Sequence, residues 1–328
     1  MSLALARRRA LFALFFVSGF CGLLYQVVWV RLAFASFGII TPVISVVISV
    51  FMLGLALGSW AGGRWIGVIT RRSRRSAIYF YALNEALIGI GAFAVPRLFA
   101  LGERILLQLG EANSVSYLLS SGVAIALSIF PWCVFMGATF PLVMAYVKEQ
   151  DSTSEKSFSF LYLANVFGAM FGALLTATAL VELLGFRHTL WLAGGANFAV
   201  ASAAVALGLR SRAAPSAIAT EGDAASSPPR KIPWVRTILF TTGLASLAME
   251  VVWTRSFTPV MGTQVYAFAA LLTVYLIGTG WGSHSYRRAI ARGAVWPIGQ
   301  LLVALAIASL LPIVLNDPRL IDRVKGCV

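Results

Sequence analysis

The sequence predicts an all-α polytopic membrane protein with about nine transmembrane helices. Three observations carry this prediction. Of the 328 residues, 59% are hydrophobic and 12% are charged, whereas soluble domains carry about 25% charged residues. The apolar runs reach the roughly 20 residues that a helix needs to cross a bilayer, far more than the roughly ten alternating residues of a barrel strand. Residues 242–283 also repeat the pattern of residues 18–59. Lipid is therefore the expected solvent for most of the chain.

Charged, Pro-rich or polar stretches separate the apolar runs from one another. Each run is long enough to satisfy its own backbone hydrogen bonds as a helix, which is what the bilayer interior requires. In chain order, the predicted spans are 11–33, 40–66, 77–101, 114–147, 158–183, 188–208, 235–256, 264–286 and 294–314. The arginines before the first run also resemble the start of a signal peptide, but this run is too long for one and recurs inside the chain. We therefore expect a retained first helix.

The net charge of +14 reflects topology and does not indicate nucleic-acid binding. Most Lys and Arg residues lie before the first predicted span or after the second, fourth, sixth and eighth, and these are alternate loops. The positive-inside rule then places the N-terminus in the cytoplasm. The partner that composition implies is the lipid bilayer, with no nucleic acid.

An offset of 224 residues aligns 18–59 with 242–283 without a gap. Six predicted helices separate the copies, so both would cross the membrane in the same direction, as parallel repeats do in major-facilitator transporters. Eleven of the 42 aligned pairs are identical: Gly19/Gly243, Leu23/Leu247, Val27/Val251, Val28/Val252, Trp29/Trp253, Arg31/Arg255, Gly38/Gly262, Val50/Val274, Gly54/Gly278, Gly58/Gly282 and Ser59/Ser283. The chain thus contains a six-helix unit and a partial, three-helix repeat of it.

These boundaries divide the chain into four parts. Residues 1–210 form the six-helix unit, and residues 234–314 form the three-helix partial repeat. Between them, residues 211–233 have the small, polar and Pro-rich composition of a linker, expected on the cytoplasmic side. Residues 315–328 form a C-terminal tail.

Several motifs together resemble one known family. They are SGFCGLLYQVVWVR at 18–31, FMLGLALGSWAGGRW at 51–65, MGATFPLVMAYV at 136–147, FSFLYLANVFGAMFGALL at 158–175 and LLGFRHTL at 183–190. This set resembles the membrane region of the bacterial fused major-facilitator/spermidine-synthase family, over nearly all of residues 10–290. The resemblance implies a bacterial inner-membrane, multi-pass domain that most relatives join to a soluble aminopropyltransferase-like domain.

Two features depart from that family. We find no Gly-rich loop after a strand pattern and no acidic cluster suited to a diamine and an adenosyl cofactor. Gln26 also stands where the first repeat of the family commonly has Glu, so only Glu250 keeps the charge. We therefore expect no aminopropyl transfer by these residues alone and assign no cofactor.

Polar residues within the spans are the candidate solute or helix-packing site. Gln26 and Trp29 share a helix face, as do Glu250 and Trp253, since three residues separate each pair. A carboxylate beside an aromatic ring suits a cationic amine. The alternative is an ion pair or hydrogen bond that fixes helix packing, which we favour for Glu250.

Four further residues complete this candidate set. Arg31 and Arg255 follow Gln26 and Glu250 by five residues, too far round the helix to pair with them, so we expect both to extend to the outer interface. Glu85 is a second potential titrating site. Asn165 lies among small residues and is expected to hydrogen-bond across a close helix contact. His and Cys show no metal-ligand spacing, so no metal is assigned.

Two functions compete at this point. The favoured one is a non-catalytic membrane subunit, scaffold or anchor that packs with other membrane subunits or a soluble enzyme, with a homo-oligomer as an option. The alternative is a transporter-like domain for a small cationic or amine solute such as a polyamine. The incomplete second repeat favours the subunit.

Overall fold

The computed structural model describes residues 2–108, 113–150, 155–210, 234–293 and 297–315. The predicted linker, residues 211–233, and nearly all of the predicted tail, residues 315–328, lie outside the described residues. The described chain is helical throughout, and its elements are α1 (Ser2–Phe37), α2 (Thr41–Ser73), α3 (Ala77–Gln108), α4 (Ser114–Gln150), α5 (Glu155–Leu175), the π-helical segment η1 (Thr176–Leu180), α6 (Val181–Arg210), α7 (Val235–Met261), α8 (Gln264–Ala291) and α9 (Ile298–Leu315).

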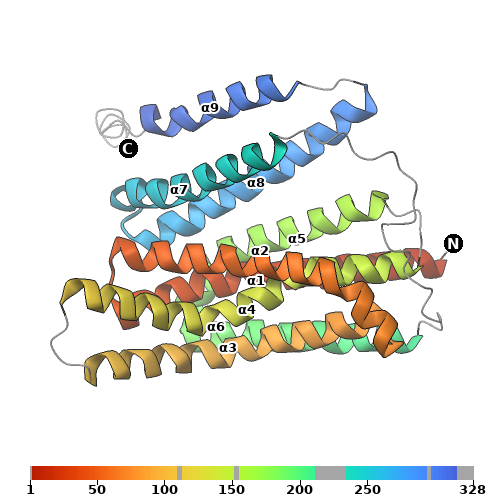
Figure 1. The fold of residues 1–328 in the computed structure, drawn as a ribbon, viewed down its shortest axis with the longest axis horizontal. Helices are drawn as coiled ribbons and strands as arrows, with labels where there is room; N and C mark the ends of the chain where they lie inside the picture. Colours follow the sequence, from red (N-terminus) through yellow and green to blue (C-terminus); the bar gives the residue numbers. More distant parts are fainter. Residues whose placement is uncertain (1, 109–112, 151–154, 211–233, 294–296, 316–328) are drawn as a thin grey trace.

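The helices lie roughly side by side in two layers (Figure 1). Helices α1 to α6, here called the first unit, form the lower layer, and α7 to α9, the second unit, form the upper one. Within the first unit, the main contacts join helices α1 to α3 with helices α4 to α6. Helix α2 packs on α4, α1 packs on α5, and α3 packs on both α4 and α6. In the second unit, α7 packs on α8. Helix α8 also packs on α5 and so joins the second unit to the first.

Among the residues that the structure describes, seven helices are long and apolar enough to cross a membrane, by length and composition. The prediction of nine spans is therefore not confirmed. One reason is that Leu161–Arg210 counts as one apolar helical segment of 50 residues, although non-helical backbone at Gly185 divides it where the sequence predicted the end of one span and the start of the next. The other is that the apolar described part of α9, Ile298–Leu310, is shorter than the other spans.

Gly185 divides that long stretch. Its φ of 71° and ψ of 171° are not helical, so α6 changes direction between Leu184 and Phe186. The Thr189 hydroxyl holds the bend by donating to the Gly185 carbonyl at 2.7 Å and to the Leu180 carbonyl at 3.0 Å. The break falls between the two predicted spans, at 183 and 188, and brings α6 back against α3.

We expect Gly185→Ala to destabilise the protein by about 1–3 kcal/mol, because only glycine readily adopts this backbone conformation. Gly195 in the same helix is the matched control: its conformation is helical and nothing lies within 4 Å of an added Cβ. Gly195→Ala should be neutral or stabilise by up to about 1 kcal/mol. Thermal unfolding in detergent compares the two; equal effects would contradict a strained bend at Gly185.

Glycines hold the first-unit helices in close contact. An added Cβ at Gly58 would overlap the Val134 carbonyl oxygen of α4, and one at Gly168 would overlap the Phe16 carbonyl oxygen of α1. Backbones can approach this closely only where side chains are missing. The glycine face of α2 and the small residues around Asn165 on α5 are therefore helix contacts.

The repeated glycines Gly38 and Gly262 occupy equivalent turns. Gly38, with φ of 98°, follows the end of α1, and Gly262, with φ of 78°, follows the end of α7. Left-handed backbone at a helix C-terminus favours glycine in both places. The pair therefore has the same local role in the α1–α2 and α7–α8 connections.

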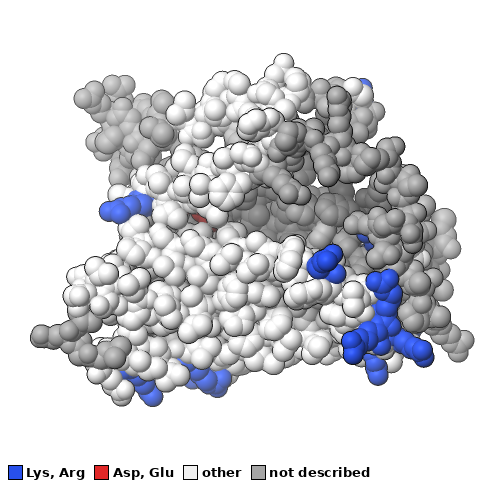
Figure 2. All heavy atoms as spheres, in the orientation of Figure 1, with Lys and Arg blue, Asp and Glu red and all other residues white. Residues whose placement is uncertain are grey.

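Charged residues lie toward the ends of the helices. Figure 2 shows Lys and Arg gathered mainly at the right-hand end, where Figure 1 places the N-terminus and the end of α2, and at the left and lower left edges. Between them, the described surface shows no Lys or Arg and only one small acidic patch, on the left of this view. A nearly uncharged band flanked by basic ends is the distribution expected of helices that cross a bilayer.

Candidate functional site

A buried carboxylate joins three helices of the first unit. Glu85 of α3 is 0% exposed. Its Oε1 accepts a hydrogen bond from the Ser18 hydroxyl of α1 at 2.6 Å, and its Oε2 accepts one from the Asn197 amide of α6 at 2.7 Å. The Tyr25 hydroxyl of α1 completes the chain by donating to Asn197 Oδ1 at 2.8 Å. We call these four residues the Glu85 network.

The Glu85 network consists of single polar side chains in otherwise apolar helices. Ser18 and Tyr25 are seven residues apart and so face the same side of α1. Both donors to Glu85 are neutral, and each links α3 to a different helix. The network therefore ties helices together in the core. Sequence reasoning named Glu85 as a candidate but missed Ser18, Tyr25 and Asn197, although an amide inside the apolar run 188–208 was a usable signal.

The repeated pairs Gln26/Trp29 and Glu250/Trp253 are in different surroundings. Gln26 and Trp29 are fully buried in α1, where Trp29 stacks on Tyr25 with ring centroids 5.1 Å apart. Glu250 and Trp253 in α7 are half-buried. In all four, one buried polar atom lacks a hydrogen-bond partner among the described residues: Gln26 Nε2, Trp29 Nε1, Glu250 Oε1 and Trp253 Nε1. Trp29 contacts the Glu85 network through its stacking on Tyr25, whereas Glu250 and Trp253 of α7 lie in another helix.

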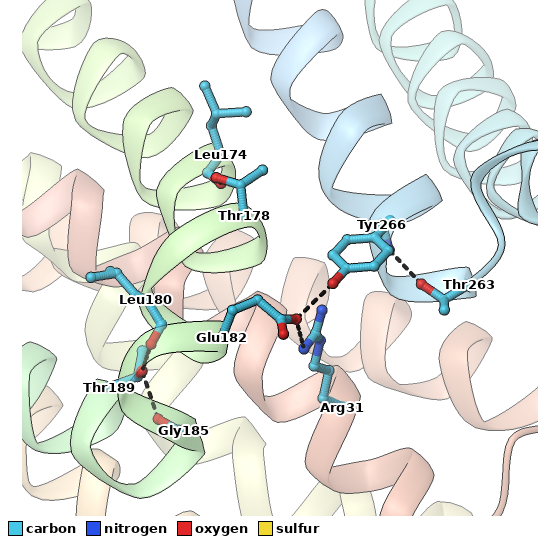
Figure 3. Close-up of polar contacts among 9 residues, drawn as sticks. All are labelled: Arg31, Leu174, Thr178, Leu180, Glu182, Gly185, Thr189, Thr263 and Tyr266. Atoms are coloured by element: carbon cyan, nitrogen blue, oxygen red, sulfur yellow. Dashed lines mark hydrogen bonds and ion pairs between the residues drawn. The ribbon is translucent and has the colours of Figure 1, made fainter.

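Arg31 joins the two units at the end opposite the N-terminus (Figure 3). Its guanidinium lies 3.7 Å from Glu182 Oε1 of α6, and the Tyr266 hydroxyl of α8 donates to the same oxygen at 2.6 Å. The guanidinium also stands 5.3 Å from the centroid of the Tyr266 ring. We call Arg31, Glu182 and Tyr266 the inter-unit cluster.

The second repeated arginine also reaches across the units. Arg255 of α7 donates from Nη1 to the Thr41 hydroxyl at the start of α2, at 2.8 Å. The sequence analysis expected both arginines to extend to the outer interface. Arg255 does lie at an exposed position, but the Arg31 side chain is only 13% exposed. Arg31 differs from the expectation because the carboxylate and two aromatic rings of the inter-unit region surround its charge.

Asn165 of α5 lies against α1 at Gly19. An added Cβ at Gly19 would overlap the Asn165 carbonyl oxygen and lie 2.6 Å from its Oδ1. Gly168 and Gly172, one and two turns further along α5, contact the α1 backbone at Phe16 and Phe20. Asn165 thus lies at a close contact of α5 with α1, whereas the hydrogen bond expected of its side chain stays a prediction.

Loss of the inter-unit cluster should loosen α8 from the first unit. Because Glu182 is 53% exposed, we expect Glu182→Gln and Tyr266→Phe each to cost no more than about 1 kcal/mol. A distance measurement between spin labels on α6 and α8 should show a broader distribution in both variants. Tyr275→Phe, on an exposed part of α8, serves as the control, and a change as large in this variant would contradict a specific role of the cluster.

No metal site is evident in the part of the chain that the structure describes. Searched alone, the described residues contain no group of three His, Cys, Asp or Glu side chains able to hold a metal. A cleft of about 420 Å³ lies between α1, α3 and α6, lined by Leu32, Ala92, Phe93, Pro96, Arg97, Phe186, Arg187, Leu190 and Trp191. None of the predicted site residues lines it.

Comparison with known proteins gives one partial relative. Polyamine aminopropyltransferase 2 of Streptomyces coelicolor (strain ATCC BAA-471 / A3(2) / M145) is 32% identical over 210 residues. The match covers 59% of this chain and 33% of the relative, so it spans about a third of that protein's length. No protein-family model and no solved structure matches the chain. The described part of the chain is thus helical, with seven helices that are long and apolar enough to cross a membrane, and the chain is similar to part of a polyamine aminopropyltransferase.

Proposed function

We propose that the chain is a non-catalytic integral membrane subunit that anchors a polyamine-related enzyme or complex by packing against further transmembrane helices. The observation that carries the proposal is the exposed second unit. Along α9 the apolar side chains Ile298, Val303, Ile307 and Leu310 are all exposed, and α9 has no extensive contact with another described helix. Apolar helices of this kind stay exposed to lipid or gain partners.

The partial relative supports the polyamine link. Its name states an aminopropyltransferase activity, and the match leaves about two-thirds of that protein without a counterpart here. The present sequence lacks the glycine-rich and acidic patterns that such chemistry needs. We therefore assign the catalytic work to a soluble enzyme partner and the membrane attachment to this chain.

The proposal includes a topology. The two units are parallel, major-facilitator-like repeats, an arrangement that the equivalent turns at Gly38 and Gly262 support. The basic residues at the end of α2 lie at the same end as the N-terminus. The N-terminus is then cytoplasmic, in a bacterial inner membrane, by the positive-inside rule.

Purification from the source membrane in mild detergent tests the proposed function. Mass spectrometry of the bound proteins should identify a partner at constant stoichiometry across several detergents. A strong salt wash serves as a control against proteins held only by the basic surface. Isolation solely as a monomer or homodimer would contradict the subunit role.

The second candidate is transport of a cationic amine such as a polyamine. The observation that favours it is Glu250: its Oε1 is buried without a described partner, and Trp253 lies one turn away. A carboxylate beside an indole can bind an ammonium group. In proteoliposomes, uptake of a labelled polyamine should then fall at least tenfold in Glu250→Gln and persist in Glu182→Gln. Equal uptake by the wild type and Glu250→Gln would exclude this site.

A further inference from the structure

Tyr275, Gly278 and Gly282 form one face of α8, here called the α8 glycine face. The offset of 224 residues makes them equivalent to Phe51, Gly54 and Gly58 of α2. On α2 this face is covered by α4. An added Cβ at Gly54 would overlap Cys133 Cβ, and one at Gly58 would overlap the Val134 carbonyl oxygen.

The α8 glycine face is uncovered. Phe51 is 2% exposed, whereas its equivalent Tyr275 is 60% exposed. Nothing lies within 4 Å of an added Cβ at Gly278 or Gly282. The same three-residue pattern is therefore packed in one copy and open in the other, because the second unit contains no described helix in the position of α4.

Two independent observations point to the same missing neighbours. Gly19 contacts α5 through Asn165, but its equivalent Gly243 has nothing within 4 Å. Likewise, α3 packs on α4 and α6, whereas α9, in the equivalent position, has no extensive contact with another described helix. All three helices of the second unit thus lack packing contacts equivalent to those that α4, α5 and α6 make in the first unit.

The residues at hand do not supply these neighbours. Residues 316–328, which lie outside the described residues, are fewer than the roughly 20 that a span needs. The α4 helix already packs against α2, and α4 of a second copy would be engaged in the same way. Neither of these supplies the cover of the α8 glycine face.

We infer that the α8 glycine face binds a transmembrane helix from polypeptide outside residues 1–328. This helix carries small side chains at four-residue spacing, as α4 carries Cys133 and Gly137 where it meets α2. Small residues on both helices allow the backbone contact that the first unit shows. The inference rests on the proposed function and adds to it the surface and the chemistry of the partner.

Site-specific photo-crosslinking in the source membrane tests the inference. The photoreactive p-benzoyl-L-phenylalanine replaces Tyr275 on the α8 glycine face. As a matched control it replaces Ile277, which is 47% exposed and equivalent to Leu53, itself 54% exposed on the packed α2. The probe at 275 should give a protein adduct that maps to a transmembrane helix outside residues 1–328 with Gly, Ala, Ser or Cys four residues apart. The probe at 277 should label lipid.

The double substitution Gly278→Leu and Gly282→Leu should reduce the adduct at position 275 at least tenfold, whereas Ile277→Phe should leave it unchanged. Adducts at 275 with lipid alone, or with a second copy of this chain, would overturn the inference. A partner that co-purifies but crosslinks only from position 277 would overturn it while leaving the proposed function intact. Failure to recover any partner would instead overturn the proposed function.

Discussion

Replacing Gly58 with alanine is expected to destabilise the first unit by about 3 kcal/mol or more, the upper end of the usual cost of overpacking. The added methyl group would overlap the Val134 carbonyl oxygen and lie 2.8 Å from the Val134 carbonyl carbon. These are backbone atoms of α4, so no rotamer change relieves the overlap. The two helices must separate, and their contact is the most extensive in the protein.

The repeat provides an internal control for this prediction. Gly282 is the equivalent residue in α8, and nothing lies within 4 Å of an added Cβ there. In the purified chain Gly282→Ala should change stability by less than about 0.5 kcal/mol. Unfolding in mixed detergent micelles gives both values. Similar destabilisation by the two substitutions would contradict the difference in packing between α2 and α8.

Replacing Asn197 with alanine is expected to cost about 2–4 kcal/mol. The amide donates to Glu85 Oε2 and accepts from the Tyr25 hydroxyl, so its loss removes a partner from each of these two buried groups, although Ser18 still donates to Glu85 Oε1. Each such group costs about 1–3 kcal/mol. Interhelical hydrogen bonds in membrane proteins average closer to about 0.6 kcal/mol, because polar groups often find other partners. Full burial of Glu85 and Tyr25 makes such replacement difficult here.

Ser202 is the control on the same helix. Its exposed hydroxyl bonds only to the Phe198 carbonyl of α6 itself, at 2.8 Å, so Ser202→Ala should lie within about 0.5 kcal/mol of the wild type. Tyr25→Phe removes one hydrogen bond of the Glu85 network, so its loss of stability should lie between those of Asn197→Ala and Ser202→Ala. If Asn197→Ala were as stable as Ser202→Ala, the network would have no structural role.

Features that depend on local sequence were predicted correctly. The apolar runs form helices, as their length and composition predict. The close contact around Asn165 followed from the small residues near it. The division at residues 183–188 also marked a real break, because the backbone at Gly185 is not helical and α6 changes direction there.

Features that depend on which helices meet could not be read from the sequence. The partners of Glu85 come from α1 and α6, more than 60 residues away in each direction, and no spacing rule connects them. Arg31 contacts Glu182 and Tyr266, which belong to two other helices. Without knowledge of these partners, the length and charge of its side chain suggested an interfacial position. Polar residues in apolar helices can be found from the sequence, but their partners can be found only from the packing of the helices.

The most direct test of the account is a structure of the protein extracted from its source membrane together with its native lipids. The account predicts, by electron cryo-microscopy, density for an additional helix beside Gly278 and Gly282, at an interaxial distance of about 8 Å. Its side-chain density should be small where it meets the glycines, as α4 is where it meets Gly54. A lone chain whose α8 glycine face is covered only by lipid would contradict the account.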